Sequence, residues 1–342
     1  MRGTQHTMTS SISCARISVA MATYNGEKYI QEQLDSLARQ DLLPMELVVT
    51  DDGSTDTTLE IVEAFARSAP FEVRIFRNEA RLGYADNFLK AASLCSGDLI
   101  AFCDQDDIWM ERKLSTCARF FSGSDTMLVA HSARVLLHSG LRGNQCPAYS
   151  VTRLWEPRLI DPFAFALGFA TIINRELLRL VDYRSRPASF RGHDRWLWFL
   201  AAGSGKIATI SDDLAFYRQH GNNLFGVSSA TVADRAKDII RTTDYNALAE
   251  REQECSSILR NAAQHAPAFA NRLRESADML DLRAQLHRSR HRIYSRESGF
   301  LRRAAAFSRI LLVGGYLPDR SHTRPGPRAG AKDLILGIPG IR

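Results

Sequence analysis

Short apolar runs alternate along the first 120 residues with segments that have the apolar spacing of a helix. The runs of strand length occupy 17–22, 46–50, 71–76 and 98–103, and the helical spacing occupies 29–40, 59–65, 84–94 and 112–121. A continuous apolar run with polar ends is typical of a strand that is buried on both faces, as in a parallel sheet. Strands and helices in this alternation predict an α/β fold with a doubly wound, mostly parallel sheet flanked by helices.

The later part of the chain has a different pattern. Apolar runs at 126–138, 206–210 and 214–218 predict three more strands, and helical spacing then runs through 232–263, 268–292 and 299–313. We therefore expect four regions: a disordered, Ser- and Thr-rich segment over 1–15, an α/β domain over 16–228, a basic helical region over 229–316, and a linker with a short apolar tail over 317–342.

Composition excludes several classes of protein. The 342 residues are 45% hydrophobic and 24% charged, which is typical of a globular protein. No stretch reaches the ~18 apolar residues that span a bilayer, and the first fifteen residues lack the apolar core of a signal peptide. The six Cys residues form no Cys-x-x-Cys pair, which favours reduced thiols. These features predict a cytoplasmic protein.

Charge is unevenly distributed. Residues 231–342 carry 20 basic and 12 acidic side chains, whereas residues 1–230 carry 24 and 26. Over 299–313 an apolar face lies beside Arg302, Arg303 and Arg309. Such a helix either packs on the rest of the protein or docks on an anionic membrane surface, so that the protein would be peripheral on the inner face of the cytoplasmic membrane. Nucleic acid is not an expected partner, because few aromatic residues interleave with the basic ones.

Two of the predicted strands end in clusters of carboxylates. The strand at 98–103 is followed by Asp104, Asp106 and Asp107, and the strand at 46–50 by Asp51 and Asp52. Carboxyl ends of parallel strands lie at one edge of the sheet, where ligands of α/β proteins bind. Asp104 and Asp106 would point to the same side, where a divalent cation would offset their repulsion. The alternative is a solvated acidic turn in which Asp107 caps the next helix.

Two further residues allow both a structural and a functional interpretation. Asp194 stands at the start of an aromatic helix, either as an N-cap or first-turn acid or as a carboxylate that accepts a proton from a hydroxyl. His220 lies in a polar Gly- and Asn-containing loop after a strand, either as a structural group or at a metal or phosphate site. Neither a Gly-x-Gly-x-x-Gly fingerprint nor a Walker A loop is present.

Taken together, these motifs resemble family 2 glycosyltransferases, which have the Rossmann-like GT-A fold. The resemblance covers about residues 16–226, and the variant is similar to rhamnosyltransferase-like enzymes of bacterial surface polysaccharide assembly. It rests on six segments of the sequence, namely 21–26, 48–56, Asn78 with Gly83 and Asn87, 103–109, 192–196 and 217–223.

The resemblance implies roles for individual residues. Tyr24, Asn25 and Glu27 would line the nucleotide-sugar site together with Gly83 and Asn87, and Asp52 would bond a pyrimidine base. Asp104-Gln105-Asp106 matches the Asp-x-Asp motif, in which Asp106 binds Mg²⁺ or Mn²⁺ and Asp104 supports the ribose or the metal. Asp194 matches the catalytic base, and His220 matches a His near the metal. The residue before the base, often Glu in the family, is His193 here.

The expected activity is inverting, metal-dependent transfer of a sugar, with rhamnose as one candidate. The donor would be a nucleotide-diphosphate sugar, and the acceptor a glycan or lipid-linked glycan of an O-antigen, capsule or exopolysaccharide. A sugar-nucleotide nucleotidyltransferase is one alternative, although 22–26 lacks a Gly-rich loop with a basic residue. A glycoside hydrolase would also pair carboxylates, but needs no nucleotide. A catalytically silent glycan-binding protein is the alternative outside enzymes.

Overall fold

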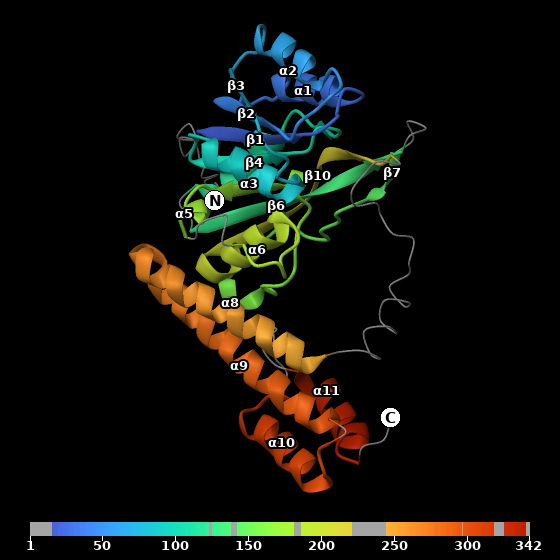
Figure 1. Ribbon diagram of the computed structural model, residues 1–342, viewed down its shortest axis with the longest axis vertical. Helices are drawn as coiled ribbons and strands as arrows, with labels where there is room; N and C mark the ends of the chain where they lie inside the picture. Colours follow the sequence, from blue (N-terminus) through green and yellow to red (C-terminus); the bar gives the residue numbers. More distant parts are fainter. Residues whose placement is uncertain are drawn as a thin grey trace, which may run out of the picture. The chain divides into compact units, whose positions relative to one another are not determined.

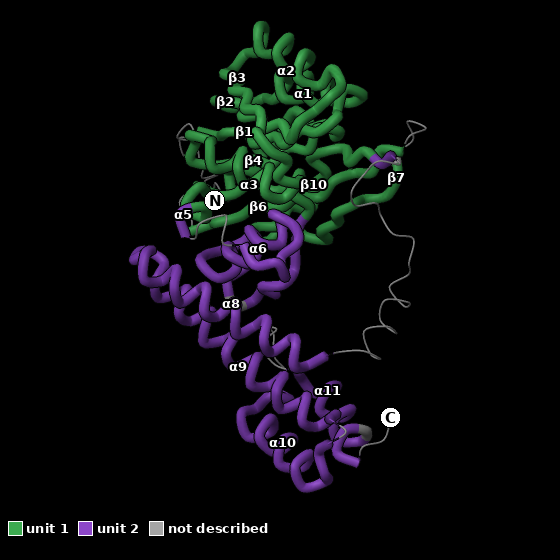
Figure 2. The backbone as a smooth tube through the Cα atoms, in the orientation of Figure 1, with its two compact units in different colours: residues 1–153, 167–178, 208–218 green, residues 154–166, 179–207, 219–342 purple. Residues whose placement is uncertain are grey.

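The computed structural model describes residues 16–122, 125–137, 142–180, 186–220, 244–295, 297–317 and 325–339. The chain divides into two compact units (Figures 1 and 2). The first unit comprises residues 1–153, 167–178 and 208–218, and the second comprises residues 154–166, 179–207 and 219–342. The segment 1–15 lies outside the described residues, and the four regions expected from the sequence stay a prediction.

Ten strands of the described chain form one mixed sheet in the order β3-β2-β1-β4-β9-β6-β10-β5, with β7 paired to β6 and β8 to β10. The strands are β1 (Ile17–Thr23), β2 (Glu46–Asp51), β3 (Glu72–Arg77), β4 (Leu99–Cys103), β5 (Ile108–Trp109), β6 (Thr126–Leu136), β7 (Arg142–Gln145), β8 (Arg153–Trp155), β9 (Thr171–Asn174) and β10 (Lys206–Arg218). The helices among the first six strands are α1 (Ile30–Ala38), α2 (Thr58–Ala66), α3 (Tyr84–Leu94) and α4 (Lys113–Ala118), followed by the 3₁₀ turn η1 (Arg119–Phe121).

The parallel part of the sheet consists of β3, β2, β1 and β4, as the apolar runs predict. Alternate residues of these strands face opposite layers of helices. Val19, Leu47 and Ala101 belong to the hydrophobic cluster that also contains residues of α1, α2 and α4. On the other face Phe102 makes an edge-to-face contact with Phe88 of α3, with ring centroids 6.1 Å apart. The doubly wound α/β arrangement is therefore confirmed.

The remaining strand pairs whose register is described are antiparallel, and they include one correction. The sequence predicts two strands at 206–210 and 214–218, but β10 runs unbroken from Lys206 to Arg218. The polar residues between the two runs suggest a turn. Asp213 instead accepts hydrogen bonds from Arg134 of β6, at 2.7 and 2.9 Å, and from Gln145 of β7 at 2.8 Å. Side chains of neighbouring strands thus satisfy a carboxylate within the sheet.

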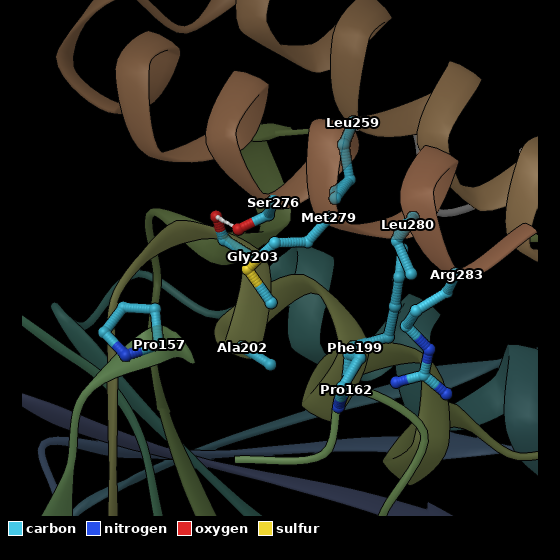
Figure 3. A pocket seen from close by; sticks show the side chains of 10 residues that line it. All are labelled: Pro157, Pro162, Phe199, Ala202, Gly203, Leu259, Ser276, Met279, Leu280 and Arg283. Carbon is cyan, nitrogen blue, oxygen red and sulfur yellow. Dashed lines mark hydrogen bonds between the residues drawn. The ribbon is translucent and has the colours of Figure 1, made fainter. Parts of the chain in front are cut away.

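The second unit is mostly helical. It contains α6 (His193–Ser204), α8 (Tyr245–His265), α9 (Ala270–Tyr294), α10 (Phe300–Leu312), α11 (Gly326–Lys332) and the π-helical turn η6 (Asp333–Gly337). Short helical elements of the described chain are η2 (Pro157–Leu159), η3 (Gly168–Ala170), α5 (Leu177–Leu180) and η5 (Pro267–Phe269). Helices α8 and α9 pack against each other, and α6 packs against α9. A small cavity of about 20 Å³ lies among them (Figure 3). Its apolar lining, which includes Phe199, Leu259 and Leu280, marks it as a packing gap.

No described helix is long and apolar enough to cross a bilayer.

A buried ion pair holds η6 against α9. Asp333 is fully buried and accepts two hydrogen bonds from Arg290, at 2.9 and 3.0 Å. The hydroxyls of Tyr294 and Tyr316 donate to the same carboxylate, at 2.7 and 2.9 Å. Burial lowers the pKa of Arg290, but the hydrogen bonds and charge of Asp333 outweigh that effect and raise it. Four donors thus satisfy this carboxylate.

We expect Asp333→Asn to destabilise the protein by about 3 kcal/mol, because the variant leaves the Arg290 guanidinium buried without its counter-charge. Urea unfolding followed by circular dichroism measures the change. The matched control is Asp278→Asn, which removes an exposed carboxylate paired to Arg260 and should cost less than about 1 kcal/mol. Equal unfolding midpoints for the two variants would show that the buried pair adds nothing.

Candidate functional site

The two acidic clusters lie at the carboxyl ends of two parallel strands, β2 and β4, on either side of β1. Strand β1 pairs with β2 on one side and with β4 on the other, and all three run in the same direction. Consequently the residues after β2, which begin with Asp52, and those after β4, which begin with Asp104, flank the loop that follows β1. Both acidic clusters therefore lie at one edge of the sheet, as the sequence predicts.

The loop after β1 is bonded to the loop after β2. Asn25, which has a left-handed backbone (φ 49°), donates its N–H to Ser54 Oγ at 2.9 Å and accepts from Thr55 N at 2.9 Å. Glu27 accepts from the hydroxyl of Thr57 at 2.8 Å and from its N–H at 3.1 Å. Asn25 and Glu27, predicted as nucleotide-site residues, thus hold the two loops together.

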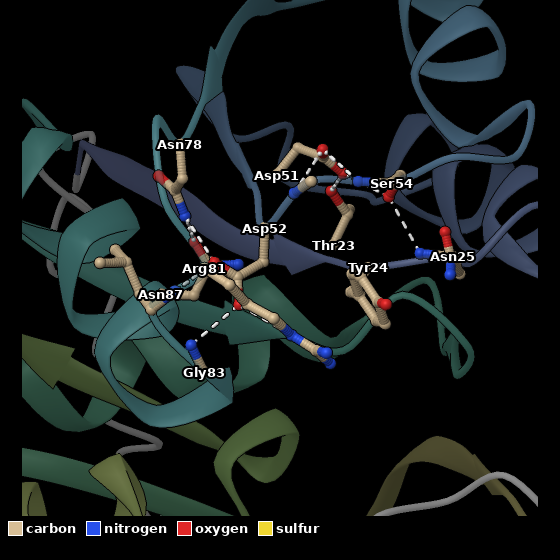
Figure 4. Close-up of polar contacts among 12 residues, drawn as sticks. Thr23, Tyr24, Asn25, Asp51, Asp52, Ser54, Asn78, Arg81, Gly83 and Asn87 are labelled. Carbon is tan, nitrogen blue, oxygen red and sulfur yellow. Dashed lines mark hydrogen bonds and ion pairs between the residues drawn. The ribbon is translucent and has the colours of Figure 1, made fainter.

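Asp51 and Asp52 have different surroundings (Figure 4). Asp51 is fully buried and accepts from Thr23 Oγ1 at 2.9 Å and from the N–H groups of Gly53 and Ser54 at 3.0 and 2.8 Å. It fixes the turn after β2. Asp52 instead points toward the segment that precedes α3.

The carboxylate of Asp52 binds the turn that begins α3. Its Oδ1 accepts from Asn78 Nδ2 at 3.0 Å and from Leu82 N at 2.7 Å, and its Oδ2 accepts from Gly83 N at 2.8 Å. Gly83 has φ 81°, a conformation that disfavours other residues. Asn87, which is buried, accepts from Asn78 Nδ2 at 2.9 Å and donates to Thr50 O at 2.9 Å. Gly83 and Asn87 therefore shape this site through Asp52.

Arg81 is a site residue that the sequence did not single out. Its guanidinium carbon lies 3.9 Å from the centroid of the Tyr24 ring, and its Nε lies 3.9 Å from Asp52 Oδ2 (Figure 4). The side chain is 64% exposed, so most of its N–H donors face solvent. A carboxylate acceptor, guanidinium donors and an aromatic ring thus stand next to one another.

Gln105, the middle residue of the Asp-x-Asp motif, joins that motif to β1. Its Oε1 accepts from Tyr24 N at 3.0 Å, and its Nε2 donates to Tyr24 O at 3.0 Å. A Cβ on Gly26 would lie 2.3 Å from Gln105 Oε1, so only glycine leaves room for this amide. The motif and the loop after β1 are held in one position by this pair.

Three carboxylates form a group that fits a hard divalent cation. Asp104, Asp106 and Asp107 each place one oxygen within 4.8 Å of the others. Asp107 is fully buried, its Oδ1 accepts from Arg218 N at 2.9 Å, and its Oδ2 has no hydrogen-bond partner. Burial, followed by the charges of Asp106 and Asp104, raises the pKa of Asp107 well above its ordinary value. Oxygen ligands of this kind suit Mg²⁺ or Mn²⁺.

The alternative role of Asp107 as a helix cap is wrong, because β5 follows it and α4 begins only at Lys113. Arg218, at the end of β10, also donates from Nε to Asp106 O at 2.9 Å and from a terminal nitrogen to Glu32 at 2.8 Å. Its guanidinium lies 4.7 Å from the Tyr29 ring centroid. Arg218 therefore fixes the backbone of the acidic loop. Cys103 is fully buried and burial raises its pKa, so it is a packing residue rather than a nucleophile.

The second unit contains the two remaining predicted residues. Asp194 is a half-buried residue in the first turn of α6, and its Oδ1 accepts from Arg195 N at 2.7 Å. Burial raises the pKa of this carboxyl. Burial, and then the charge of Arg186, lower the pKa of His193 to about 3, so that His193 is neutral near pH 7. The proposed roles of Asp194 as a base and of His220 at a metal stay predictions.

The chain belongs to glycosyltransferase family 2. The model of the family described as "Glycosyl transferase family 2" matches residues 18–176, which contain both acidic clusters. The dTDP-rhamnosyl transferase RfbG of Shigella flexneri is 30% identical over 230 residues, which cover 64% of this chain and 76% of RfbG. The family favours a glycosyltransferase over the nucleotidyltransferase and hydrolase alternatives.

Other similar proteins agree with this assignment. An uncharacterized protein of Mycobacterium tuberculosis is 29% identical over 224 residues, 65% of this chain and 63% of that protein. The poly(ribitol-phosphate) β-N-acetylglucosaminyltransferase TarS of Staphylococcus aureus is 38% identical over 211 residues, 59% of this chain and 35% of TarS. A crystal structure of TarS 1–349 in complex with UDP-GlcNAc has a TM-score of 0.52 at 19% identity and covers 95% of this chain and 91% of that one. The fold is therefore GT-A, and the chain spans less than two thirds of the mycobacterial relative.

Proposed function

We propose that the protein transfers a sugar from a nucleotide-diphosphate donor to a glycan with inversion at the anomeric carbon. The observation that carries this proposal is the arrangement at the edge of β1, β2 and β4. An acceptor and donor pair, Asp52 and Arg81, stands beside the Tyr24 ring, and three carboxylates follow β4. The first group suits a nucleobase, and the second suits a metal-bound diphosphate.

The nucleobase of the proposed donor is uracil or thymine. Each oxygen of a carboxylate can accept two hydrogen bonds, and among the described residues Asp52 Oδ2 accepts one hydrogen bond of ordinary length, from Gly83. It can accept another from the ring N–H of uracil or thymine. Arg81 can donate to a carbonyl oxygen next to that N–H, and Tyr24 offers a ring for stacking. Cytosine has no hydrogen at the corresponding ring nitrogen.

The diphosphate is assigned to Asp104 and Asp106, and the role of His220 rests on the family resemblance alone. Mg²⁺ or Mn²⁺ held by these carboxylates would neutralise charge on the leaving diphosphate. Asp194 takes the proton of the acceptor hydroxyl while the oxygen of that hydroxyl bonds to the anomeric carbon. In the same step the bond between the anomeric carbon and the phosphate oxygen of the donor breaks. Because the attack and the departure are on opposite sides, one displacement inverts the centre. The burial that raises the pKa of Asp194 makes it a stronger base than an exposed Asp.

The relatives support a role in bacterial surface polysaccharide biosynthesis. RfbG is named for transfer from dTDP-rhamnose, and TarS for transfer of N-acetylglucosamine to poly(ribitol-phosphate). A deoxyhexose such as rhamnose, or another hexose, is the proposed donor sugar. The acceptor is a growing glycan, which we place on a lipid carrier at the cytoplasmic face of the membrane.

Nucleotide binding tests the proposed donor class. We expect UDP or dTDP to bind about tenfold more tightly than CDP in calorimetric titrations with Mn²⁺, because CDP leaves the Asp52 oxygen without a donor. Arg81→Ala should weaken UDP or dTDP binding about fivefold, since a largely exposed charged hydrogen bond contributes about 1 kcal/mol.

The matched control for Arg81→Ala is Arg67→Ala, which removes an exposed arginine at the end of α2 and should leave the affinity unchanged. Equal affinity for CDP and UDP, or equal effects of the two variants, would contradict this account of base recognition.

A further inference from the structure

Helix α10 of the second unit has large apolar side chains on the side that faces solvent. Phe300, Leu301, Leu311 and Leu312 are 63%, 81%, 58% and 85% exposed. In a helix, positions 300, 304 and 311 lie on one side, and positions 301, 305, 308 and 312 lie next to them. Among the described residues of these seven positions, Ser308 is the single polar side chain. We call Phe300, Leu301, Leu311 and Leu312 the outer strip.

Packing within the second unit does not account for the outer strip. The opposite side of α10, with Ala306 and Ile310, is buried against Leu286 and Ile293 of α9 and against Tyr316. Helix α10 lies alongside α9 in the orange and red part of the chain (Figure 1). The helix is thus already anchored by one apolar side while it exposes a second one.

More exposed apolar residues lie on neighbouring segments. Val313 and Leu317 follow α10 and are 50% and 59% exposed, and Leu334 and Ile335 of η6 are 53% and 62% exposed. Turn η6 contacts α10 and is fixed by the Asp333 pair described above. Half of the large hydrophobic side chains exposed in the described chain are in 300–335. Exposed apolar residues gathered on neighbouring segments in this way indicate an interaction site.

The charges around the outer strip are mostly positive. Arg302 and Arg309 are exposed on α10 itself, one position beyond Leu301 and two before Leu311. Arg328 of α11 is also exposed, and residues 299–342 hold eight Arg and Lys against two Asp. One of the two acids, Asp333, is buried and neutralised by Arg290. The surface therefore combines exposed Leu and Phe side chains with an excess of cations.

We propose that the outer strip of α10 docks the protein on a bilayer that contains anionic phospholipids. The four apolar side chains would enter the boundary between headgroups and acyl chains, and Arg302 and Arg309 would meet the lipid phosphates. A second copy of the chain fits less well, because pairing two such surfaces would bring like charges together. The inference does not depend on sugar transfer, since it rests on α10 and its neighbours alone.

Vesicle flotation of the full chain tests this proposal without any turnover. We expect the protein to float with vesicles of phosphatidylcholine and phosphatidylglycerol, and Leu301→Ser with Leu312→Ser to lower the partition coefficient at least about tenfold. The control Leu43→Ser with Val151→Ser replaces two similarly apolar, exposed side chains outside the helical unit and should bind as the wild type does.

Charge is tested with a second pair of variants. Arg302→Gln with Arg309→Gln should weaken binding about tenfold on anionic vesicles, and the difference should vanish on pure phosphatidylcholine. Its control is Arg67→Gln with Arg119→Gln, which removes two exposed arginines elsewhere.

Absence of flotation at low salt, or equal flotation of the strip variant and its control, would overturn the proposal. So would sedimentation velocity that shows a wild-type dimer and a monomeric strip variant without vesicle binding, because the strip would then be an interface between copies. Circular dichroism and unfolding midpoints equal to wild type confirm that the strip variants are folded.

Discussion

Asp106→Asn is expected to lower the turnover of the nucleotide-sugar donor by about a thousandfold or more. Asp106 is one of three carboxylates that each place one oxygen within 4.8 Å of the others, and in the proposed cation site each would contribute charge. Loss of one charged ligand weakens binding of the metal, and stabilisation of a leaving diphosphate is worth several kcal/mol. A thousandfold change in rate corresponds to about 4 kcal/mol. Nucleotide release at a series of Mn²⁺ and Mg²⁺ concentrations measures the effect.

The control for this variant is Asp41→Asn, which removes an exposed carboxylate of the same unit that bonds to Ser115. It should turn over donor as the wild type does. The Asp106 variant should retain the wild-type unfolding midpoint, because its carboxylate is not part of the buried core. If folded Asp106→Asn turns over donor as fast as the wild type at every metal concentration, the three carboxylates take no part in the reaction.

Asp194→Asn should lower kcat by about a thousandfold while nucleotide affinity stays within about twofold of wild type. General-base catalysis contributes about a hundredfold to ten-thousandfold, and an amide cannot take the proton of the acceptor. In the wild type, kcat/KM should rise with pH as Asp194 ionises. Because burial raises the pKa of Asp194, the midpoint of this rise lies at a pH above the ordinary pKa of Asp. On acidification the enzyme should therefore lose activity at a higher pH than it would with an exposed Asp as the base.

Glu254→Gln, at an exposed position of α8 in the same unit, is the control and should match the wild type. Two outcomes contradict the role of Asp194. The first is transfer at the wild-type rate by Asp194→Asn. The second is an equal loss of nucleotide affinity and turnover, which would place Asp194 in donor binding rather than in proton transfer.

The sequence was sufficient for the parallel part of the fold because three of its four strands, β1, β2 and β4, are buried on both faces. Strand β4 is apolar at every residue from Leu99 to Cys103 and is completely buried, so its pattern is hard to mistake. Helix α3 begins and ends at the predicted residues, Tyr84 and Leu94. The unbroken strand β10 was missed because Asp213 is polar, and only the position of Arg134 and Gln145 on neighbouring strands explains how it stays in the sheet.

The candidate site was predicted in part. The acidic residues were found because they follow apolar runs directly. The roles of Arg81, Gln105 and Arg218 were not, because each depends on contacts between distant segments. Gln105 bonds to Tyr24, 81 residues away, and Arg218 bonds to Asp106, 112 residues away. Neither spacing nor residue type reveals such a partner before the strands are placed.

We propose that this chain turns over a nucleotide-diphosphate sugar at the edge of β1, β2 and β4. The most direct test is nucleotide release from a panel of UDP-, dTDP- and GDP-sugars with Mn²⁺ or Mg²⁺, with wild type beside Asp106→Asn and Asp194→Asn. We expect the wild type to release nucleotide from a UDP- or dTDP-sugar in a metal-dependent reaction, and both variants to lose this activity. Release from none of the donors, or release that is the same in all three proteins, would contradict it.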